Sequence, residues 1–202
     1  TTDDVIAALK NKYAKPLIAI LPGSRKQEIQ KKLPIMMQAT KNFAENHFVV
    51  AKAPGIDDEF YESLLAGNQN ISTVRNATYS LLNHADAALV TSGTATLETA
   101  LFQVPQVVCY KGNNISYQIA KRLIKIKFIS LVNLIMDKMV VKELIQHELT
   151  PANLISELNS ILLDDAKRKH IMQDYTALKQ ILTEDGNASA NAADIIYTES
   201  KK

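Results

Sequence analysis

Short apolar runs alternate along the chain with segments whose apolar residues recur at helical spacing. The runs are rich in residues that favour extended structure, which is typical of β-strands. The predicted strands are residues 17–21, 48–51, 71–74, 87–90 and 106–110. Because these runs are apolar on both faces, we expect helices to cover both sides of the sheet, as they do in parallel sheets.

The segments between the predicted strands have the period of an amphipathic helix. In the first of them, apolar and small residues recur at i, i+4, i+7 and i+8, at Ile29, Leu33, Met36 and Met37. Strands that alternate with helices in this way form βαβ units, and such units build a parallel sheet. The sequence therefore predicts an α/β fold.

From about Leu154 onward the pattern is helical only. Two apolar stripes predict two helices, and residues 185–187 then break the chain before a last helix at about 188–198. The stripes consist of Leu154, Leu158, Ile161 and Leu162, and of Ile171, Tyr175, Leu178 and Leu182. We expect one α/β domain over residues 1–183 and a helical C-terminal tail over residues 184–202.

Composition excludes several classes of protein. Of the 202 residues, 47% are hydrophobic and 22% charged, which is unlike a disordered chain, and 6 Gly and 6 Pro are too few for a collagen. The net charge of +2 carries no signature of nucleic-acid binding. No apolar run approaches the roughly 20 residues that span a bilayer. The single cysteine, Cys109, lies in an apolar strand, so we expect a buried, unreactive thiol in a reducing compartment.

Ligands of open parallel sheets bind beyond the carboxyl ends of the strands, so the strand-to-helix loops are the candidate sites. The first such loop is Leu-Pro-Gly-Ser-Arg at residues 21–25. Gly23 permits close backbone approach, and Ser24 suits a helix N-cap. Exposed N–H groups at a helix start, together with the Arg25 guanidinium, would form an anion site suited to phosphate. An ordinary turn with a solvated arginine is the alternative.

A second loop of this kind, residues 91–98, follows the fourth predicted strand. The N–H groups at its helix start and the hydroxyls of Ser92 and Thr94, beside Gly93, are suited to a diphosphate. Glu98, one turn into the helix, can accept hydrogen bonds from two vicinal hydroxyls, as on a ribose. A capped helix with an acidic first turn is the alternative. Neither a GxxxxGK[ST] loop nor a GxGxxG fingerprint occurs.

Residues 110–133 are basic and apolar. This composition is typical of a helix at an anionic membrane surface or around a lipid phosphate, and an amphipathic core helix with a solvated basic face is the alternative. We expect residues 130–133 to be a strand end that places a polar side chain, Asn133, in the cleft. The basic residues are Lys111, Lys121, Arg122, Lys125 and Lys127.

No catalytic or metal-binding constellation is evident. The four histidines are scattered without metal-ligand spacing, and no Ser-His-Asp set or general base stands out. We therefore expect no metal and no other cofactor.

Five motifs, in order, resemble lipid-A-disaccharide synthases over roughly residues 15–195. The first two are the loops at residues 21–29 and 92–98, and the others lie at residues 120–123, 130–134 and 141–144. The resemblance implies the C-terminal, UDP-sugar-binding half of a GT-B glycosyltransferase, in which two Rossmann-like domains face a cleft. The resemblance leads us to expect a fragment without the first domain and without the carboxylate that would act as general base. The start at Thr1 instead of Met agrees with a fragment or a trimmed chain, and simple removal of Met before Thr is the alternative.

The resemblance also implies a reaction and partners. Such enzymes transfer 2,3-diacylglucosamine from UDP-2,3-diacylglucosamine to 2,3-diacylglucosamine 1-phosphate, with inversion, in the lipid A biosynthesis of Gram-negative bacteria. We expect a cytoplasmic protein, peripheral on the anionic cytoplasmic face of the inner membrane, that contacts the missing N-terminal domain through its last helix. A homodimer is one further option, and no nucleic acid is expected.

Each candidate residue then acquires an implied role. Arg25 would stabilise the leaving group, Glu98 would bind the ribose, and Asn133 would lie on the sugar or lipid side. The remaining donor-binding residues are Gly23 and Ser24 at the diphosphate or sugar, Ser92, Gly93 and Thr94 at the diphosphate, and Arg75 and Asn76 at the uracil.

Two alternatives remain open at this stage. One is another UDP-sugar enzyme of this architecture, such as a UDP-N-acetylglucosamine 2-epimerase. The other is a non-catalytic membrane-docking module. For the transferase fragment, we expect weak binding of the UDP-sugar without turnover.

Overall fold

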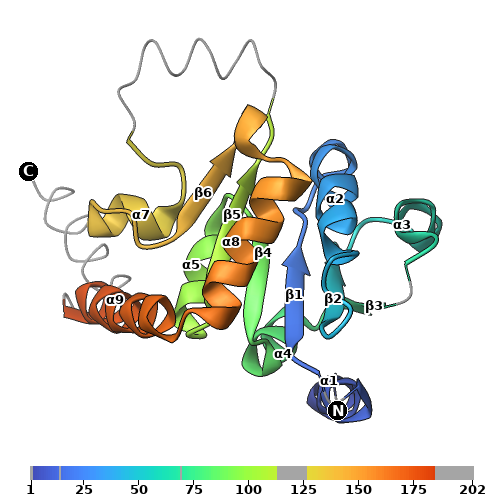
Figure 1. The fold of residues 1–202 in the computed structure, drawn as a ribbon, viewed down its shortest axis with the longest axis horizontal. Helices are drawn as coiled ribbons and strands as arrows, with labels where there is room; N and C mark the ends of the chain where they lie inside the picture. The colour runs from blue at the N-terminus through green and yellow to red at the C-terminus, as the bar shows by residue number, and fades with distance from the viewer. Residues whose placement is uncertain (1, 14, 69, 113–126, 185–202) are drawn as a thin grey trace, which may run out of the picture.

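The computed structural model describes residues 2–13, 15–68, 70–112 and 127–184. All five predicted strands are confirmed, and the structure adds a sixth strand, β6. The helices α1, α4 and α7 are also additions. In chain order the elements are α1 (Thr2–Tyr13), β1 (Leu17–Leu21), α2 (Lys26–Thr40), β2 (His47–Lys52), α3 (Asp58–Leu65), β3 (Ile71–Arg75), α4 (Thr78–His84), β4 (Ala87–Thr91), α5 (Thr94–Leu101), β5 (Gln106–Tyr110), α7 (Leu131–Met136), β6 (Lys142–Ile145), a 3₁₀ turn (Gln146–Glu148), α8 (Pro151–Leu163) and α9 (Asp165–Glu184) (Figure 1).

The six strands form one parallel sheet in the order β3-β2-β1-β4-β5-β6. This is the order of a Rossmann fold, so the predicted α/β class and its Rossmann-like form are confirmed. Strands β2 and β3 lie on one side of β1, and β4, β5 and β6 lie on its other side. The loops after β1 and β4 therefore diverge and leave a crevice at the carboxyl edge of the sheet.

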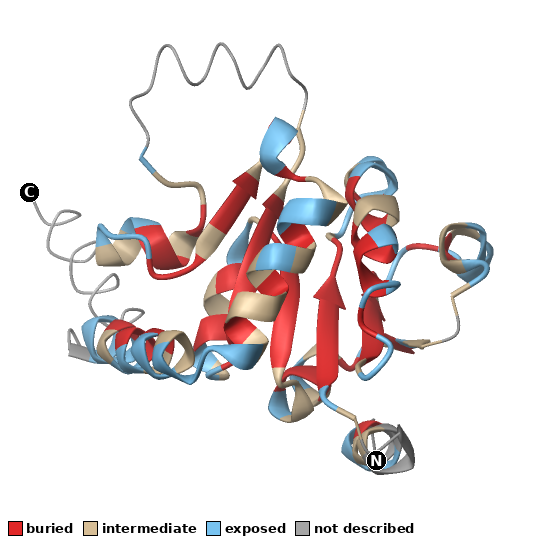
Figure 2. Cartoon of the chain, viewed as in Figure 1, coloured by how far each residue is buried: buried red, intermediate tan, exposed pale blue. Residues whose placement is uncertain are grey.

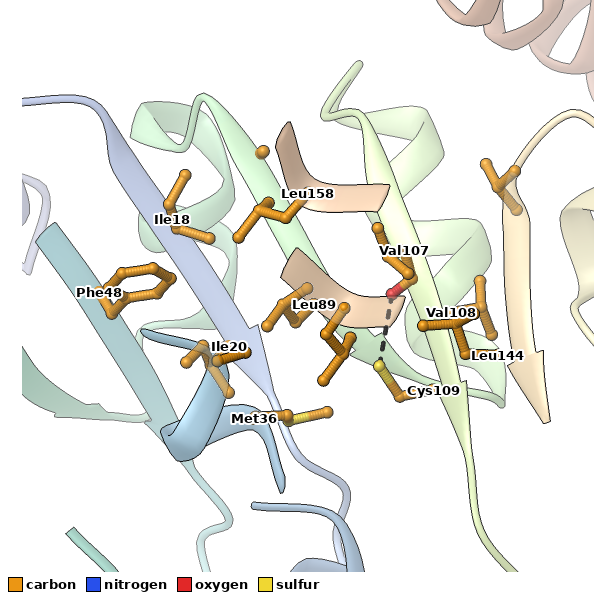
Figure 3. Packing of buried hydrophobic residues seen from close by; sticks show 14 of the residues in the cluster. Ile18, Ile20, Met36, Phe48, Leu89, Val107, Val108, Cys109, Leu144 and Leu158 are labelled. Atoms are coloured by element: carbon orange, nitrogen blue, oxygen red, sulfur yellow. Dashed lines mark hydrogen bonds between the residues drawn. The ribbon is translucent and has the colours of Figure 1, made fainter. Parts of the chain in front are cut away.

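Helices cover both faces of the sheet, as the apolar strands predict. Ile18 and Ile20 of β1 point to the face that α2 and α8 cover, where Leu158 packs against Leu89 of β4 (Figure 3). Residues with the opposite parity, such as Ala19, face α1 and α4 on the other side. Figure 2 shows the result, with buried strands in the centre of the molecule and exposed residues on the outer surfaces of the helices.

The expectation of a strand end at residues 130–133 is wrong. Ser130 is the N-cap of α7, and its side chain accepts a hydrogen bond from the Asn133 backbone N–H. The strand that pairs with β5 is β6, which begins only at Lys142, beyond the motif at residues 130–133. A hydroxyl that caps the first turn favours helix over strand at this point.

The predicted helical region is confirmed as far as α9. Helix α8 begins at Pro151 after the N-cap Thr150, and α9 continues to Glu184. The predicted break at residues 185–187, the last helix and the division between a domain ending at 183 and a tail at 184–202 lie outside, or at the edge of, the described residues.

The thiol of Cys109 gives a first prediction. It is fully buried in β5, near the Val107 carbonyl (Figure 3), and burial raises its pKa from 9.0 to about 12. At pH 8 the folded protein should therefore hold about a thousandth of the thiolate of the unfolded chain. We expect Ellman's reagent to label Cys109 only after addition of denaturant. Rapid stoichiometric labelling of the folded protein would contradict this account.

Candidate functional site

The two predicted phosphate loops meet in one pocket at the carboxyl edge of the sheet. Its volume is about 270 Å³, and its walls come from the ends of β1, β2 and β4 and the first turns of α2 and α5. The predicted site residues that line it are Gly23, Ser24, Ser92, Gly93, Thr94 and Glu98. Lys52, Pro54 and Thr78 also line the pocket, because β2 ends and α4 begins at this edge of the sheet. None of these three residues was predicted as a site residue. Four other predicted site residues do not line this pocket: Arg25, Arg75, Asn76 and Asn133.

The first loop needs its glycine. Gly23 has a φ of +117°, and a Cβ at this position would lie 2.8 Å from Oε2 of Glu28. The N-cap of α2 is Arg25 and not Ser24, because the helix begins at Lys26 and Arg25 is the extended residue directly before it. The Ser24 side chain is exposed at the pocket and makes no hydrogen bond to any residue that the structure describes.

Arg25 is not part of the pocket lining. Its side chain is 82% exposed, and Nη1 lies 3.4 Å from Oε1 of Glu28, three residues later on the same helix. An exposed pair of this kind contributes little to stability, so the guanidinium is free to exchange partners. Its role at a leaving group stays a prediction.

The second loop presents its backbone to the pocket. Gly93, with a φ of +151°, is the N-cap of α5, and its carbonyl accepts hydrogen bonds from the N–H and hydroxyl of Thr96. Within the described ranges, the N–H groups of Gly93, Thr94 and Ala95 have no backbone acceptor, as is usual at a helix start. These N–H groups and the positive helix end suit an anion.

The hydroxyl of Ser92 is already in use. Its Oγ donates to the carbonyl of Ile129 at 2.9 Å, across a separation of 37 residues. This hydroxyl can still accept a hydrogen bond, but its proton is committed to Ile129. The loop therefore offers a diphosphate backbone N–H groups and the Thr94 hydroxyl before it offers Ser92.

Glu98 and Asn76 lie beside one another at the other end of the site. Glu98 is partly buried and lines both the main pocket and a shallow hollow that Asn76, Thr78 and Tyr79 also line. Asn76 adopts a left-handed conformation with a φ of +53°, directly after β3. This arrangement puts a carboxylate next to the loop where the uracil is expected.

Arg75 is bound to the loop that follows β2, which forms part of the pocket wall. Its guanidinium donates to the carbonyls of Ala53, Pro54 and Ile56 and pairs with Asp58. Lys52 also pairs with Asp58, and these two cations lower the pKa of that carboxyl. The Arg75 side chain therefore shapes the loop after β2, and its predicted uracil contact has no support in this geometry.

Asn133 belongs to a buried network and does not face the cleft. The Asn133 amide donates to the Val141 carbonyl and Glu143 Oε1, and its oxygen accepts from the N–H groups of Val140 and Val141. With 0% exposure and both amide atoms engaged, this side chain has no hydrogen-bonding capacity left for a ligand. Its predicted place in the cleft is wrong because the α7 turn directs it inward.

Glu143 is the centre of that network. Its carboxylate accepts hydrogen bonds from the backbone N–H groups of Ile129 and Ser130, the Ser130 hydroxyl and the Asn133 amide, at 2.7–2.9 Å. Since Ile129 in turn accepts the Ser92 proton, Glu143 of β6 is connected to the phosphate loop. In the sequence, Glu143 stands out only as part of the motif at residues 141–144.

The basic stretch is described only at its ends. Lys111 is partly buried, and Lys127 is exposed with its ammonium 3.2 Å from Asp137. Lys121, Arg122 and Lys125 lie outside the described residues. Across the described ranges, no three acidic, histidine or cysteine side chains are grouped to hold a metal, and no helix is long and apolar enough to cross a bilayer.

Comparison with known proteins identifies the family. Residues 2–196 match the family model for lipid-A-disaccharide synthetase. The chain belongs to the lipid-A-disaccharide synthase family. The synthase of Syntrophus aciditrophicus (strain SB) is 38% identical over 191 residues, which are 92% of this chain and 50% of that protein. That of Myxococcus xanthus (strain DK1622) is 35% identical over 186 residues, or 90% and 49%. The chain thus spans about half the length of these relatives.

Solved structures support the fold alone. The calicheamicin glycosyltransferase CalG4 superposes with a TM-score of 0.61 at 20% identity, over 91% of this chain and 42% of that one. A protein described as a UDP-N-acetylglucosamine 2-epimerase from Listeria monocytogenes gives 0.57 at 16% identity, over 86% and 45%. The lipid-A-disaccharide synthase chain therefore has the architecture of one half of a GT-B glycosyltransferase.

The Glu143 network gives a second prediction. Replacing Glu143 with Ala removes the acceptor of the partly buried Ile129 N–H and of the buried Ser130 N–H, at a cost of about 1–3 kcal/mol for each buried donor left unsatisfied. We expect Glu143→Ala to lower the free energy of unfolding, measured by urea denaturation, by about 3 kcal/mol. The exposed Glu59→Ala is the matched control and should change it by less than about 0.5 kcal/mol. Equal stability of the two variants would argue against this network.

Proposed function

We propose that the chain is the donor-binding domain of a lipid-A-disaccharide synthase. In the whole protein it holds UDP-2,3-diacylglucosamine, from which 2,3-diacylglucosamine passes to 2,3-diacylglucosamine 1-phosphate with inversion. The observation that carries the proposal is the single pocket in which the loops after β1 and β4 meet. Membership of the family favours this transfer over the epimerase and the docking module.

The pocket divides the donor among its walls. The N–H groups at the start of α5 and the Thr94 hydroxyl bind the diphosphate. Glu98 accepts hydrogen bonds from the ribose hydroxyls. The uracil lies against the loop at Asn76, which borders the hollow beside Glu98. The sugar then extends toward Gly23 and Ser24 on the β1 side.

Catalysis by this half is electrostatic. Negative charge grows on the diphosphate as the bond to the anomeric carbon breaks, and N–H dipoles fixed by the α5 turn stabilise it without reorganisation. We propose that Arg25 leaves Glu28 and adds its charge to the same oxygens. These groups supply the compensating charge, so the proposal assigns no role to a metal.

The other half of the site comes from outside this chain. The missing N-terminal domain supplies the acceptor surface and the general base. We further propose that Lys111, Lys127 and the basic residues between them meet the anionic surface of the inner membrane on its cytoplasmic side, where both acylated substrates reside.

Donor binding gives a third prediction. The 202-residue chain should bind UDP in a calorimeter, and Glu98→Ala should weaken binding about tenfold, as expected for the loss of a hydrogen bond to a charged group. Glu59→Ala is the control and should bind like the unmodified chain. Binding to anionic vesicles without any binding of millimolar UDP would instead support the membrane-docking module.

Arg25 gives a fourth prediction, for the full-length enzyme that contains this chain. Loss of one charge-stabilising donor lowers turnover by about 10²–10³-fold in comparable sites. We expect Arg25→Ala to do so with unchanged thermal unfolding, because the side chain is exposed. The 202-residue chain alone should form no disaccharide. Near-normal turnover of Arg25→Ala would remove this residue from the mechanism.

A further inference from the structure

A second carboxylate lines the pocket, in addition to Glu98. Glu28 lies in the first turn of α2, on the β1 side, and is partly buried with 34% of its side chain exposed. Glu98 lies in α5, on the β4 side, next to the hollow at Asn76. The N–H groups that suit a diphosphate belong to the loop that precedes Glu98. A sugar nucleotide that extends from Asn76 across these N–H groups therefore reaches Glu28 with its sugar.

Two cations lie beside the Glu28 carboxylate, one of them exposed and one buried. Arg25 lies 3.4 Å from Oε1, and the ammonium of Lys32 lies 3.9 Å from Oε2. Lys32 is 2% exposed, and its burial lowers its pKa while Glu28 opposes that shift. A buried ammonium needs a compensating anion, and the Glu28 carboxylate is the anion that lies beside Lys32.

The first loop is shaped to admit this carboxylate. The absent Cβ of Gly23 leaves the space that Oε2 of Glu28 occupies, and the methyl group of Thr91 closes the same space from β4. The hydroxyl of Thr91 is buried and has no hydrogen-bond partner in the described part of the chain. Because buried polar atoms are nearly always hydrogen-bonded, this wall is suited to a polar ligand group.

The charge of Glu28 determines which ligand group it can receive. An ionised carboxylate only accepts hydrogen bonds, and it repels phosphate oxygens. Its partner must therefore carry hydroxyl or amide protons. The ribose is already assigned to Glu98, and the remaining part of a sugar nucleotide with such protons is the sugar itself.

We propose that Glu28 accepts hydrogen bonds from the hydroxyl or amide groups of the sugar on a nucleoside diphosphate, and so selects the sugar nucleotide over the free nucleotide. This inference rests on the proposed function, since it assumes that the pocket binds a UDP-sugar. Lys32 is then a positioning residue that acts through Glu28.

Calorimetry with two ligands tests the inference. UDP and UDP-N-acetylglucosamine, which share every group except the sugar, are titrated into the 202-residue chain and its variants. We expect Glu28→Ala to weaken binding of UDP-N-acetylglucosamine by about tenfold to a hundredfold and not to weaken that of UDP, because the lost carboxylate repels phosphate oxygens. Glu28→Gln, which keeps one acceptor oxygen, should give a smaller effect. Gln30→Ala, an exposed change on the same helix, is the control.

Each other outcome overturns a different statement. If UDP binds but its affinity and that of the sugar nucleotide fall together in Glu28→Ala, with an unchanged thermal midpoint, Glu28 merely supports the loop and the inference fails. If both affinities are unaffected, the inference also fails and donor binding stands. If neither ligand binds the unmodified chain, the proposed donor-binding function fails together with the inference.

Discussion

Parallel pairing of strands that are buried on both faces is the constraint on which the rest of this structure depends. Because every strand of the sheet runs in the same direction, every strand-to-helix loop emerges at one edge. The change of direction between β1 and β4 opens a crevice there, and the pocket lies in it. The site is thus a consequence of strand order before it is a property of any single residue.

The pocket at this edge contains groups of opposite charge, namely the start of a helix and two acidic side chains. The start of α5 is positive and suits the diphosphate, whereas Glu28 and Glu98 are negative and suit hydroxyl groups on either side of it. Gly23 and Gly93 hold backbone conformations that bring these groups close to a ligand. A sugar nucleotide has the same order of neutral and charged parts, and this is the physical basis of the donor that we propose for the pocket.

Buried polar groups connect the edge of the sheet to the site. Glu143 in β6 organises the backbone at Ile129 and Ser130, and Ile129 receives the proton of Ser92. The motifs at residues 130–134 and 141–144 therefore meet in one network, although the sequence analysis treated them separately. Asn133 was misassigned because an amide that faces a cleft and an amide that satisfies buried backbone groups have the same local sequence.

The spacing of apolar residues and the residue types of a loop are local properties of the chain. The sequence by itself therefore determined the α/β class, five strands and the two loops proposed to bind phosphate. Their glycines and hydroxyls are recognisable wherever the strands finally lie. The position of β6, the inward turn of Asn133, the internal commitment of Arg75 and Ser92, and the approach of Glu28 to the pocket were decided only by the tertiary structure. Each of these depends on which polar atoms find partners far away in the chain, and buried groups take the partner that the packed fold provides.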